Sequence, residues 1–313
     1  MTKSISKNHK NSLIELMRFL FALWVLYYHG FVPYRVNGFG DGFLAVEFFF
    51  VLSGFYLIRT IDKYKDLPTK QGLKQFLKHR FASIAIPFLI NEVFVLYRSF
   101  VIDPSIINFS FGFLWYIRDL FIAISVIFIL RKRCSSDKKF YQTLALLSAI
   151  AFFAFYPIWW LAWPGGPFRS IASIPLGMFA ALIPKLSANN QNKSKGFLTK
   201  FAIVLGLLVT SLICLKITYL PKTTLLRYIL VIIIYPAMIY FASCINFNCA
   251  FLNWLGSLSF LIYSFQCPLR ILQHYGLTNS THLFIILMAM VLAYSLIDNI
   301  VKLKKSKTQK GLI

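Results

Sequence analysis

Apolar runs separated by short polar segments are the dominant pattern along the chain. A helix needs about 20 apolar residues to cross the hydrocarbon core of a bilayer. By that criterion the 313 residues form a single integral-membrane domain, residues 1–313, with ten predicted spans. The predicted fold class is all-α, a polytopic bundle of transmembrane helices. The predicted spans are 13–32, 43–59, 81–102, 111–130, 140–163, 169–183, 198–217, 225–245, 255–273 and 282–302.

The first apolar run follows a basic segment, which is also the arrangement of a secretory signal peptide. The run is longer than the apolar region of such a peptide and contains two charged residues, Glu15 and Arg18. It also lacks the small-x-small exit at which signal peptides are cleaved. We therefore expect an uncleaved first span.

Basic residues are concentrated in the polar segments on one side of the predicted membrane. With a cytoplasmic N-terminus, 24 of the 33 Lys and Arg residues fall in inside segments, and three, Arg35, Arg169 and Lys222, fall in outside segments. Short cytoplasmic loops of membrane proteins carry such an excess of basic residues. The asymmetry predicts that both termini are cytoplasmic. The inside segments are 1–12, 59–80, 131–139, 184–200, 246–254 and 302–313.

The composition narrows the classes of function. Apolar residues make up 58% of the chain and charged residues only 14%, which excludes a water-soluble enzyme, because soluble domains are about one quarter charged. The net charge of +23 does not indicate a nucleic-acid partner, since the basic residues do not form one hydrated face. The five cysteines form no CxxC pair and no Cys/His cluster with metal-ligand spacing, so no metal is expected.

Several charged residues fall deep inside the predicted spans. Each costs roughly 3 kcal/mol to insert unless it is paired or lines a wet cavity. An ionisable residue inside the membrane is therefore a functional candidate by default. The deep set consists of Glu15, Arg18, Glu47, Glu92, Arg118 and Asp119.

Arg18 and His29 are predicted to share one face of the first span. Eleven residues separate them, which is about 20° from three full helical turns and about 16 Å along the helix axis. Arg18 would then lie near the cytosolic end and His29 in the outer part of the membrane, facing one common lumen. Glu15, three residues before Arg18, is placed to pair with it.

Glu47 and His29 are predicted to lie at a similar depth. Glu47 is about four residues from the outer end of the second span, and His29 about three from the outer end of the first. The connection between the spans is short, so the two helices are expected to be antiparallel neighbours. A carboxylate that fixes the tautomer of an imidazole leaves the other ring nitrogen able to accept a proton. We therefore predict that Glu47 orients His29.

Two motifs mark these first two spans. Glu15 and Arg18 form E-x-x-R, with His29 after ten further residues, and residues 42–55 read G-x-x-x-V-E-F-F-F-V-L-S-G-F. Together they resemble the integral-membrane acyltransferase-3 family, and the likeness covers most of the chain. Similar elements follow at Arg80 and Pro87, at Leu114-Trp115-Tyr116, and at Leu255-Gly256-Ser257-Leu258-Ser259-Phe260-Leu261-Ile262-Tyr263.

The resemblance implies ten core spans and transfer of an acetyl or other acyl group from cytosolic acyl-coenzyme A. The acceptor it implies is a hydroxyl of a cell-surface or lipid-linked glycan, at a bacterial cytoplasmic membrane. Acetyl-coenzyme A would be the donor substrate, with no metal. His29 becomes the candidate base, with Glu47 as its orienting residue. Arg18, Lys78 and Arg80 are the candidate coenzyme-binding residues, and Glu92, Trp115, Arg118 and Asp119 the candidate acceptor-binding residues.

Two positions depart from the pattern of the family. Ser83 stands where a second Arg usually follows Arg80 by three residues. Gln266 lies in the region where a His usually follows the Tyr of the last element, although an amide still donates and accepts hydrogen bonds. Lys74, Lys78 and His79 are charges that could serve in place of the missing Arg.

Two other classes of function also fit the sequence. A transporter or flippase of a glycan precursor also lines its pathway with membrane charges and uses broken helices. The Gly and Pro residues at Ser53-Gly54, Pro175–Gly177 and Pro236 fit such interruptions. A catalytically inactive member of the family, acting in a glycan-assembly complex, fits the departures at Ser83 and Gln266.

Overall fold

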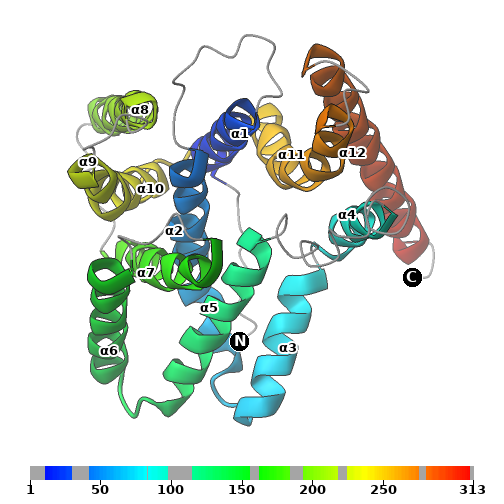
Figure 1. Cartoon of the computed structure of the whole chain (residues 1–313). Coiled ribbons are helices and arrows are strands. Elements are labelled where there is room, and N and C mark those ends of the chain that lie inside the picture. Colours follow the sequence, from blue (N-terminus) through cyan, green and yellow to red (C-terminus); the bar gives the residue numbers. More distant parts are fainter. Residues whose placement is uncertain are drawn as a thin grey trace.

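The structure is a bundle of helices (Figure 1). It is a computed structural model that describes residues 11–29, 42–82, 84–97, 115–155, 162–183, 193–217, 224–274 and 280–310. Within these ranges there are helices, turns and short connections and no β-strand. The predicted all-α fold class is confirmed for the described part of the chain.

Each predicted span overlaps at least one helix of the described residues, and the number of membrane spans stays a prediction. Short π-helical turns at 151–155 and 230–234 continue α6 and join α9 to α10. The helices are α1 (Ser12–Tyr28), α2 (Gly42–Ile61), α3 (Thr69–Ala82), α4 (Ala85–Tyr97), α5 (Trp115–Arg133), α6 (Asp137–Ile150), α7 (Ala162–Leu182), α8 (Lys193–Ile217), α9 (Thr224–Ile229), α10 (Tyr235–Ser243), α11 (Ala250–His274) and α12 (Ser280–Lys310).

Four helical segments are long and apolar enough to cross a membrane by length and composition alone. They are 44–64, 197–216, 225–243 and 281–301 within the described residues, and 167–182 is a shorter apolar segment. The last of the four buries only 17% of its most apolar stretch inside the bundle. Apolar side chains exposed to this extent suit a lipid environment, because hydrocarbon replaces the protein interior as their surroundings.

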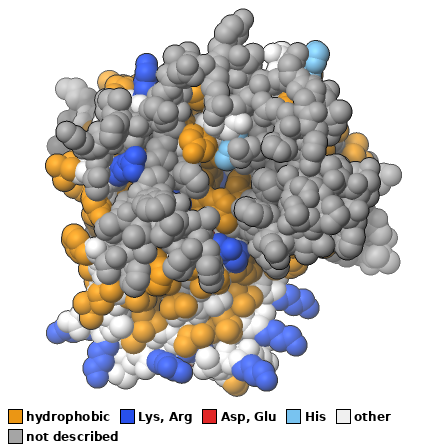
Figure 2. Space-filling model, in the orientation of Figure 1, with side chains coloured by type: hydrophobic (Ala, Val, Ile, Leu, Met, Phe, Trp, Pro, Cys, Tyr) orange, Lys and Arg blue, Asp and Glu red, His pale blue; other side chains and the backbone are white. Residues whose placement is uncertain are grey.

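The predicted inside segment 59–80 contains a helix, α3, that the search for apolar runs does not detect. Gly72 and Phe76 are buried on one side of α3, whereas Lys74 and Lys78 are exposed on the other. Figure 2 shows lysines and arginines gathered at this end of the molecule, below the apolar surface. The exposed basic residues of this end are Lys63, Lys65, Lys70, Lys74, Lys78, Arg133, Lys138 and Lys139.

Helices α2 and α7 cross in close contact at two glycines. A Cβ atom at Gly54 would overlap the backbone carbonyl of Ile174, and a Cβ at Gly177 would overlap that of Val51. Small residues permit such close approach of two membrane helices. Both helices are continuous through these positions, and α7 also continues through Pro175. The sequence interpretation of these glycines and of Pro175 as helix interruptions is therefore wrong.

Helix α1 lies between two apolar clusters. Phe21 and Val25 pack into the larger cluster, with residues of α2, α5, α7 and α10. Ala22 and Leu26 pack into the smaller one, with residues of α11 and α12. Arg18 borders the candidate site together with Ala22 and Val25, which belong to the two clusters.

Candidate functional site

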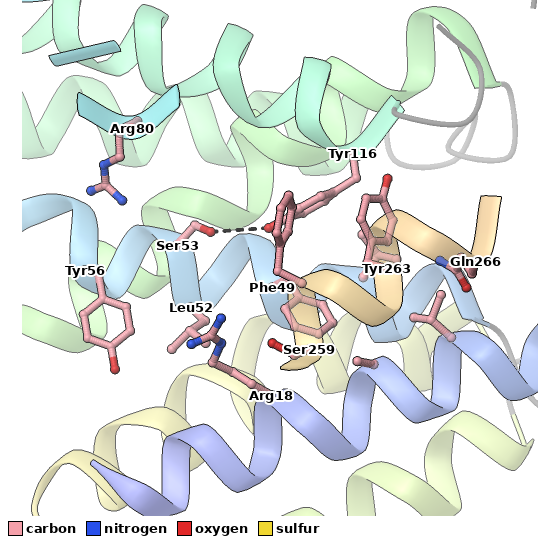
Figure 3. A pocket seen from close by; sticks show the side chains of 14 residues that line it. Arg18, Phe49, Leu52, Ser53, Tyr56, Arg80, Tyr116, Ser259, Tyr263 and Gln266 are labelled. Carbon is pink, nitrogen blue, oxygen red and sulfur yellow. Dashed lines mark hydrogen bonds between the residues drawn. The ribbon is translucent and has the colours of Figure 1, made fainter. Parts of the chain in front are cut away.

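The candidate site is a cavity of about 250 Å³ enclosed by α1, α2, α5 and α11 (Figure 3). Its walls are largely apolar and aromatic, with Phe49, Tyr116 and Tyr263 on three different helices. The rings of Tyr116 and Tyr263 lie 5.5 Å apart and meet edge to face. We call this space the inner cavity. Its polar lining comprises Arg18, Ser53, Tyr56, Arg80, Tyr116, Ser259, Tyr263 and Gln266.

A wider cavity of about 960 Å³ adjoins the inner cavity, and we call it the vestibule. It extends between α4, α5, α11 and α12, and includes Asn253 and Ser257 of α11 and Asp298 and Asn299 of α12. The two cavities share part of their walls, and we call this shared part the junction. The shared residues are Arg18, Ser53, Arg80, Tyr116 and Phe260.

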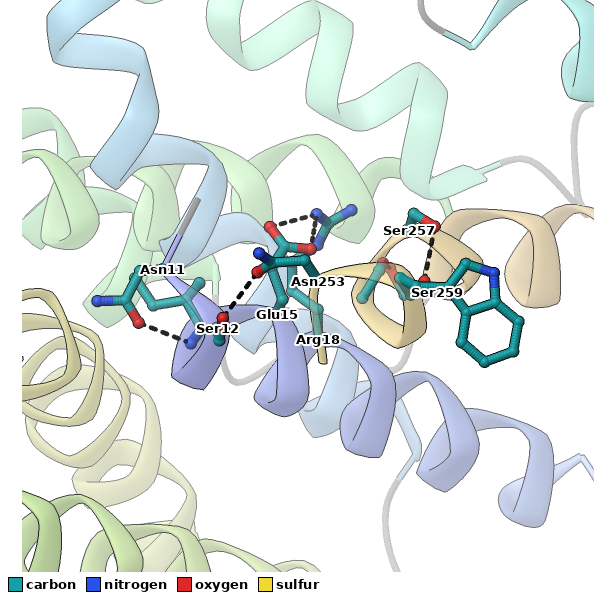
Figure 4. Close-up of polar contacts among 10 residues, drawn as sticks. Asn11, Ser12, Glu15, Arg18, Asn253, Ser257 and Ser259 are labelled. Carbon is teal, nitrogen blue, oxygen red and sulfur yellow. Dashed lines mark hydrogen bonds and ion pairs between the residues drawn. The ribbon is translucent and has the colours of Figure 1, made fainter. Parts of the chain in front are cut away.

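The beginning of α1 is fixed by polar contacts (Figure 4). The side chain of Asn11 accepts hydrogen bonds from the backbone of Leu13 and Ile14, which caps the helix. Its amide nitrogen donates to the carbonyl oxygens of Ala242 and Ile245, at 2.8 and 2.7 Å. These bonds join the start of α1 to the end of α10.

Helices α1 and α11 run parallel and in register. The Ser12 hydroxyl donates to Asn253 Oδ1 at 2.9 Å, across a separation of 241 residues. Glu15 lies against Gly256, at the same separation, and a Cβ at Gly256 would overlap the Glu15 carboxylate and backbone. Glycine at this position therefore lets α11 approach α1 beside a buried acid.

This register explains which residues line the inner cavity. Beyond Glu15, the cavity-lining positions of α1 are 18, 22 and 25, and those of α11 are 259, 260, 263 and 266. Three pairs, 18 with 259, 22 with 263 and 25 with 266, keep the offset of 241 that joins Ser12 to Asn253. The inner cavity thus follows one face of each helix, and the next position on the α1 face is His29.

Arg18 and Glu15 form an ion pair at the wall of the inner cavity. Arg18 Nη1 lies 3.1 and 2.8 Å from the two carboxylate oxygens of Glu15, which confirms the predicted pairing. The side chain of Glu15 is 6% exposed and that of Arg18 is 27% exposed. Both described contacts use the same nitrogen, so the guanidinium keeps donors that can bind an anion in the cavities.

Arg80 reaches the same junction from α3. Its Nη2 donates to Thr60 Oγ1 at 2.6 Å, and its guanidinium lies over the ring of Phe76 at 5.7 Å. Burial disfavours the charged form, so the pKa of Arg80 lies below its ordinary value. Lys78 is exposed on the other side of α3, outside the described walls of both cavities.

His29 caps the C-terminal end of α1, one helical turn beyond Val25 and outside the described walls of both cavities. Its backbone N–H donates to the carbonyl of Val25 at 3.1 Å, and its ring meets that of Tyr28 at 5.2 Å. The helix is continuous from Arg18 to Tyr28, so the axial offset from Arg18 to His29 is about 16 Å, as predicted. The side chain of His29 is half-buried.

Glu47 is paired with α7 in the described contacts. Arg169 Nε donates to Glu47 Oε1 at 2.6 Å, and the Ser173 hydroxyl donates to Oε2. Glu47 is fully buried and Arg169 is 4% exposed. The predicted contact of Glu47 with His29 is not among the described ones and stays a prediction. Arg169, which the sequence analysis assigns to an outside segment, lies buried within α7.

Three of the candidate acceptor-binding residues lie at the start of α5, on its α7 side. The ring of Trp115 lies 5.0 Å from the Arg169 guanidinium. Arg118 Nε pairs with Asp119 Oδ1 at 2.8 Å, and Asp119 is fully buried. Glu92 belongs to α4, which packs mainly against α11, so its place in the same cleft stays a prediction.

The comparisons with known proteins place this arrangement in a family. The acyltransferase-3 family model, described as an acyltransferase domain, matches residues 11–297. The chain belongs to the acyltransferase-3 family. No curated protein and no solved structure gives a match. The family and the apolar helices show a membrane acyltransferase, which acts on an acyl donor and an acyl acceptor.

The motif residues of the acyltransferase-3 family have distinct places in the bundle. Arg18 and Ser53 line both cavities, whereas Gly54 makes the contact with α7 and Gly256 the contact with α1. Adjacent Trp115 and Tyr116 face different surroundings, the Arg169 pair and the inner cavity respectively. Position 83 lies outside the described residues. Among the described residues, no three His, Cys, Asp or Glu side chains are grouped to hold a metal.

Proposed function

We propose that this acyltransferase moves an acetyl group from cytosolic acetyl-coenzyme A to a hydroxyl of a cell-surface or lipid-linked glycan. The observation that carries the proposal is the junction of the two cavities, whose walls include Arg18 of α1 and Arg80 of α3. The bundle is proposed to have ten spans with both termini cytoplasmic, in a bacterial cytoplasmic membrane. This topology puts the exposed basic end of the molecule in the cytosol.

The junction suits the polyphosphate end of coenzyme A. Guanidinium groups form charge-assisted hydrogen bonds with phosphate oxygens, and Arg18 and Arg80 both border the vestibule. The vestibule, at about 960 Å³, has room for the nucleotide. Lys78 and the neighbouring exposed lysines attract the anion to this end without lining its pocket.

The pantetheine arm would extend from the junction along the face of α1 that lines the inner cavity. This face passes from Arg18 over Ala22 to Val25, and His29 lies one helical turn further along the chain. The apolar walls exclude water from the thioester and so limit its hydrolysis. The offset of about 16 Å from Arg18 to His29 separates the phosphate-binding residue from the proposed base.

His29 is the proposed base. A ring nitrogen accepts the proton of the acceptor hydroxyl while the oxygen forms a bond to the thioester carbonyl carbon. The carbon–sulfur bond then breaks, and the thiolate of coenzyme A leaves and takes up a proton. Transfer in two steps, with an acyl group carried on His29, is the alternative order of events. In either case Glu47 is proposed to orient the imidazole.

The acceptor would approach from the start of α5. Trp115 is proposed to offer an aromatic face for a sugar ring and Arg118 to donate to its hydroxyl groups, with the buried Asp119 acting through its ion pair with Arg118. Glu92 is proposed to line the same approach from α4. Arg118 is also the candidate donor to the oxyanion that forms during acyl transfer.

Replacement of the proposed base tests the function. His29→Ala should abolish acetylation of the surface glycan, measured by NMR of O-acetyl groups in a strain that carries the variant. Membrane insertion and the amount of glycan should match the parent. His282→Ala is the matched control, because His282 lies exposed on α12, and it should leave acetylation intact.

Purified protein separates the enzyme from the two other classes of function. The enzyme should consume acetyl-coenzyme A by hydrolysis or transfer, and His29→Ala should not. A glycan transporter or an inactive family member would consume none. Absence of both reactions with every sugar tested would therefore overturn the proposed function.

A further inference from the structure

One part of the vestibule wall is polar, and it lies where α11 meets α12. Trp254 Nε1 donates to the Ser295 hydroxyl at 3.2 Å, which joins the two helices at this place. The polar residues stand within about one helical turn of that bond along one helix or the other. We call them the polar end of the vestibule: Asn253, Ser257, Asp298 and Asn299.

The side chains of the polar end can bind a ligand in the vestibule. All four line its wall and none is buried, with Ser257 and Asn299 exposed. The Ser257 hydroxyl donates to the carbonyl of Trp254 at 2.6 Å, which leaves its oxygen able to accept a hydrogen bond. The two oxygens of an ionised carboxylate offer about four acceptor positions, so Asp298 can bind a ligand as well as protein groups.

The polar end and the inner cavity lie on opposite sides of Arg18 along α1. Ser12 bonds Asn253 at the start of α1, and Arg18 follows six residues, or about 9 Å, further along that helix (Figure 4). The inner cavity continues past Arg18 to Val25. Coenzyme A has its parts in the same order, because its phosphates lie between the adenine base and the pantetheine arm. Phosphates at the junction and an arm in the inner cavity therefore leave the base for the polar end.

Asp298 restricts the chemistry of the group that can bind beside it. A carboxylate repels phosphate and only accepts hydrogen bonds, so its ligand must bring an N–H or an O–H group. Adenine carries a 6-amino group, and an asparagine amide such as that of Asn299 can pair with the 6-amino group and N7 together. Trp254 and Tyr294 line the vestibule close by and offer aromatic surface to a planar base.

We propose that the polar end of the vestibule binds the adenine base of the acyl donor, with Asp298 accepting a hydrogen bond from the 6-amino group and Asn299 pairing with the same edge. The inference rests on the proposed function, since it takes the donor to be a coenzyme A thioester. It assigns recognition of the base to α11 and α12, apart from the proposed phosphate-binding residues Arg18 and Arg80.

The test compares two nucleotides that differ at position 6 of the base. Adenosine 3′,5′-bisphosphate carries the amino group, and inosine 3′,5′-bisphosphate carries an oxygen there. Titration calorimetry of the full-length wild type in detergent should show about three- to tenfold tighter binding of the adenosine compound, the value of one hydrogen bond. Asp298→Asn should abolish most of this preference, because an amide can donate to the 6-oxo group as well as accept from the 6-amino group.

Two controls separate recognition of the base from effects of charge and folding. Asp66→Asn removes the same charge from an exposed position outside the described walls of both cavities, and it should keep the preference. 4′-Phosphopantetheine, which lacks the nucleotide, should bind Asp298→Asn and the wild type equally. If thermal unfolding shows that Asp298→Asn does not fold, Asn299→Leu replaces it. That variant should weaken binding of adenosine 3′,5′-bisphosphate about three- to tenfold and leave 4′-phosphopantetheine unaffected.

The outcomes that overturn the inference differ from those that overturn the proposed function. If the wild type binds coenzyme A but binds the two bisphosphates equally, the polar end does not read the base. A preference for adenosine that persists in folded Asp298→Asn and Asn299→Leu places the base elsewhere and also overturns the inference. So does a preference over 2′-deoxyadenosine 3′,5′-bisphosphate alone, since it assigns Asp298 to the ribose. If the wild type neither binds coenzyme A nor consumes acetyl-coenzyme A, the proposed function fails, and the inference fails with it.

Discussion

Two of the carboxylate–guanidinium pairs in the helical bundle, Glu15–Arg18 and Glu47–Arg169, have different surroundings. Glu15 and Arg18 come from one helix, and Arg18 is 27% exposed where the two cavities meet. Glu47 and Arg169 come from two helices, and they are 0% and 4% exposed. The first pair leaves a cation in the wall of both cavities, whereas the second joins α2 to α7 in the interior. The two pairs have the same chemical groups and differ in their access to solvent.

The largest expected effect on stability comes from removing one partner of the buried Glu47–Arg169 pair. Glu47→Leu leaves Arg169 as an uncompensated buried charge, which we expect to reduce the free energy of unfolding by about 3–5 kcal/mol. The matched variant Glu15→Leu should cost less, because water reaches Arg18 through the cavities. Thermal unfolding in detergent measures both. Equal losses of stability in the two variants would contradict the expectation that the buried pair is more sensitive than the pair at the cavities.

A double replacement sharpens the same comparison. Glu47→Leu with Arg169→Met removes both charges, so we expect it to be more stable than Glu47→Leu alone. Glu47→Leu should unfold at the lowest temperature. The double variant should unfold at a higher temperature, which is at or below that of the wild type. A double variant that is less stable than Glu47→Leu would show that Arg169 stabilises the bundle by other contacts, such as that with Trp115.

Replacement of Arg18 should act on binding. Charge-assisted hydrogen bonds contribute about 1.5–3 kcal/mol each, so Arg18→Ala should weaken binding of coenzyme A about 10- to 100-fold. Combining it with Glu15→Gln avoids an unpaired buried charge and separates binding from stability. Isothermal titration calorimetry of the folded variants provides the measurement. Unchanged affinity in both would exclude the junction as the phosphate site.

The smallest expected effects on coenzyme A binding come from replacing Arg80, which lines the cavities, and Lys78, which lies on the surface. Arg80→Ala should weaken coenzyme A binding by about tenfold, since Arg80 borders both cavities. Lys78→Ala should weaken it by less than about fivefold, because exposed charge pairs contribute at most about 1 kcal/mol. The effect of Lys78→Ala should also disappear at about 1 M salt, where screening acts over about 3 Å. The reverse ranking would place the phosphates on the outer side of α3.

The sequence predicts local features of this site well. The Glu15–Arg18 pair depends only on a spacing of three residues in a helix, and the structure contains it. The shared face of Arg18 and His29 depends on helical periodicity alone, and α1 is continuous between them. The family motifs identify the helices that enclose the inner cavity, because they fall on α1, α2, α5 and α11.

Features that depend on packing between distant segments cannot be predicted from one sequence. Arg169 meets Glu47 across 122 residues, and no spacing rule connects them. The sequence did carry one indication of the Arg169–Glu47 contact. A carboxylate inside a span requires a partner, and few cations lie within or beside the predicted spans. The register of α1 and α11 likewise depends on Gly256, whose role appears only once Glu15 is seen against it. Helix α3 escaped detection because its buried face consists of only a few residues.

The central claim is that the acyl donor lies between α1 and α11, and photo-crosslinking tests it most directly. Purified protein would be labelled with a coenzyme A that carries a photoreactive acyl group, and the labelled peptides would be mapped by mass spectrometry. We expect labels within 18–29 of α1 and 259–266 of α11, which excess coenzyme A should suppress. Suppressible labelling confined to α7, α8, α9 or α10 would contradict the claim, since those helices do not enclose the inner cavity.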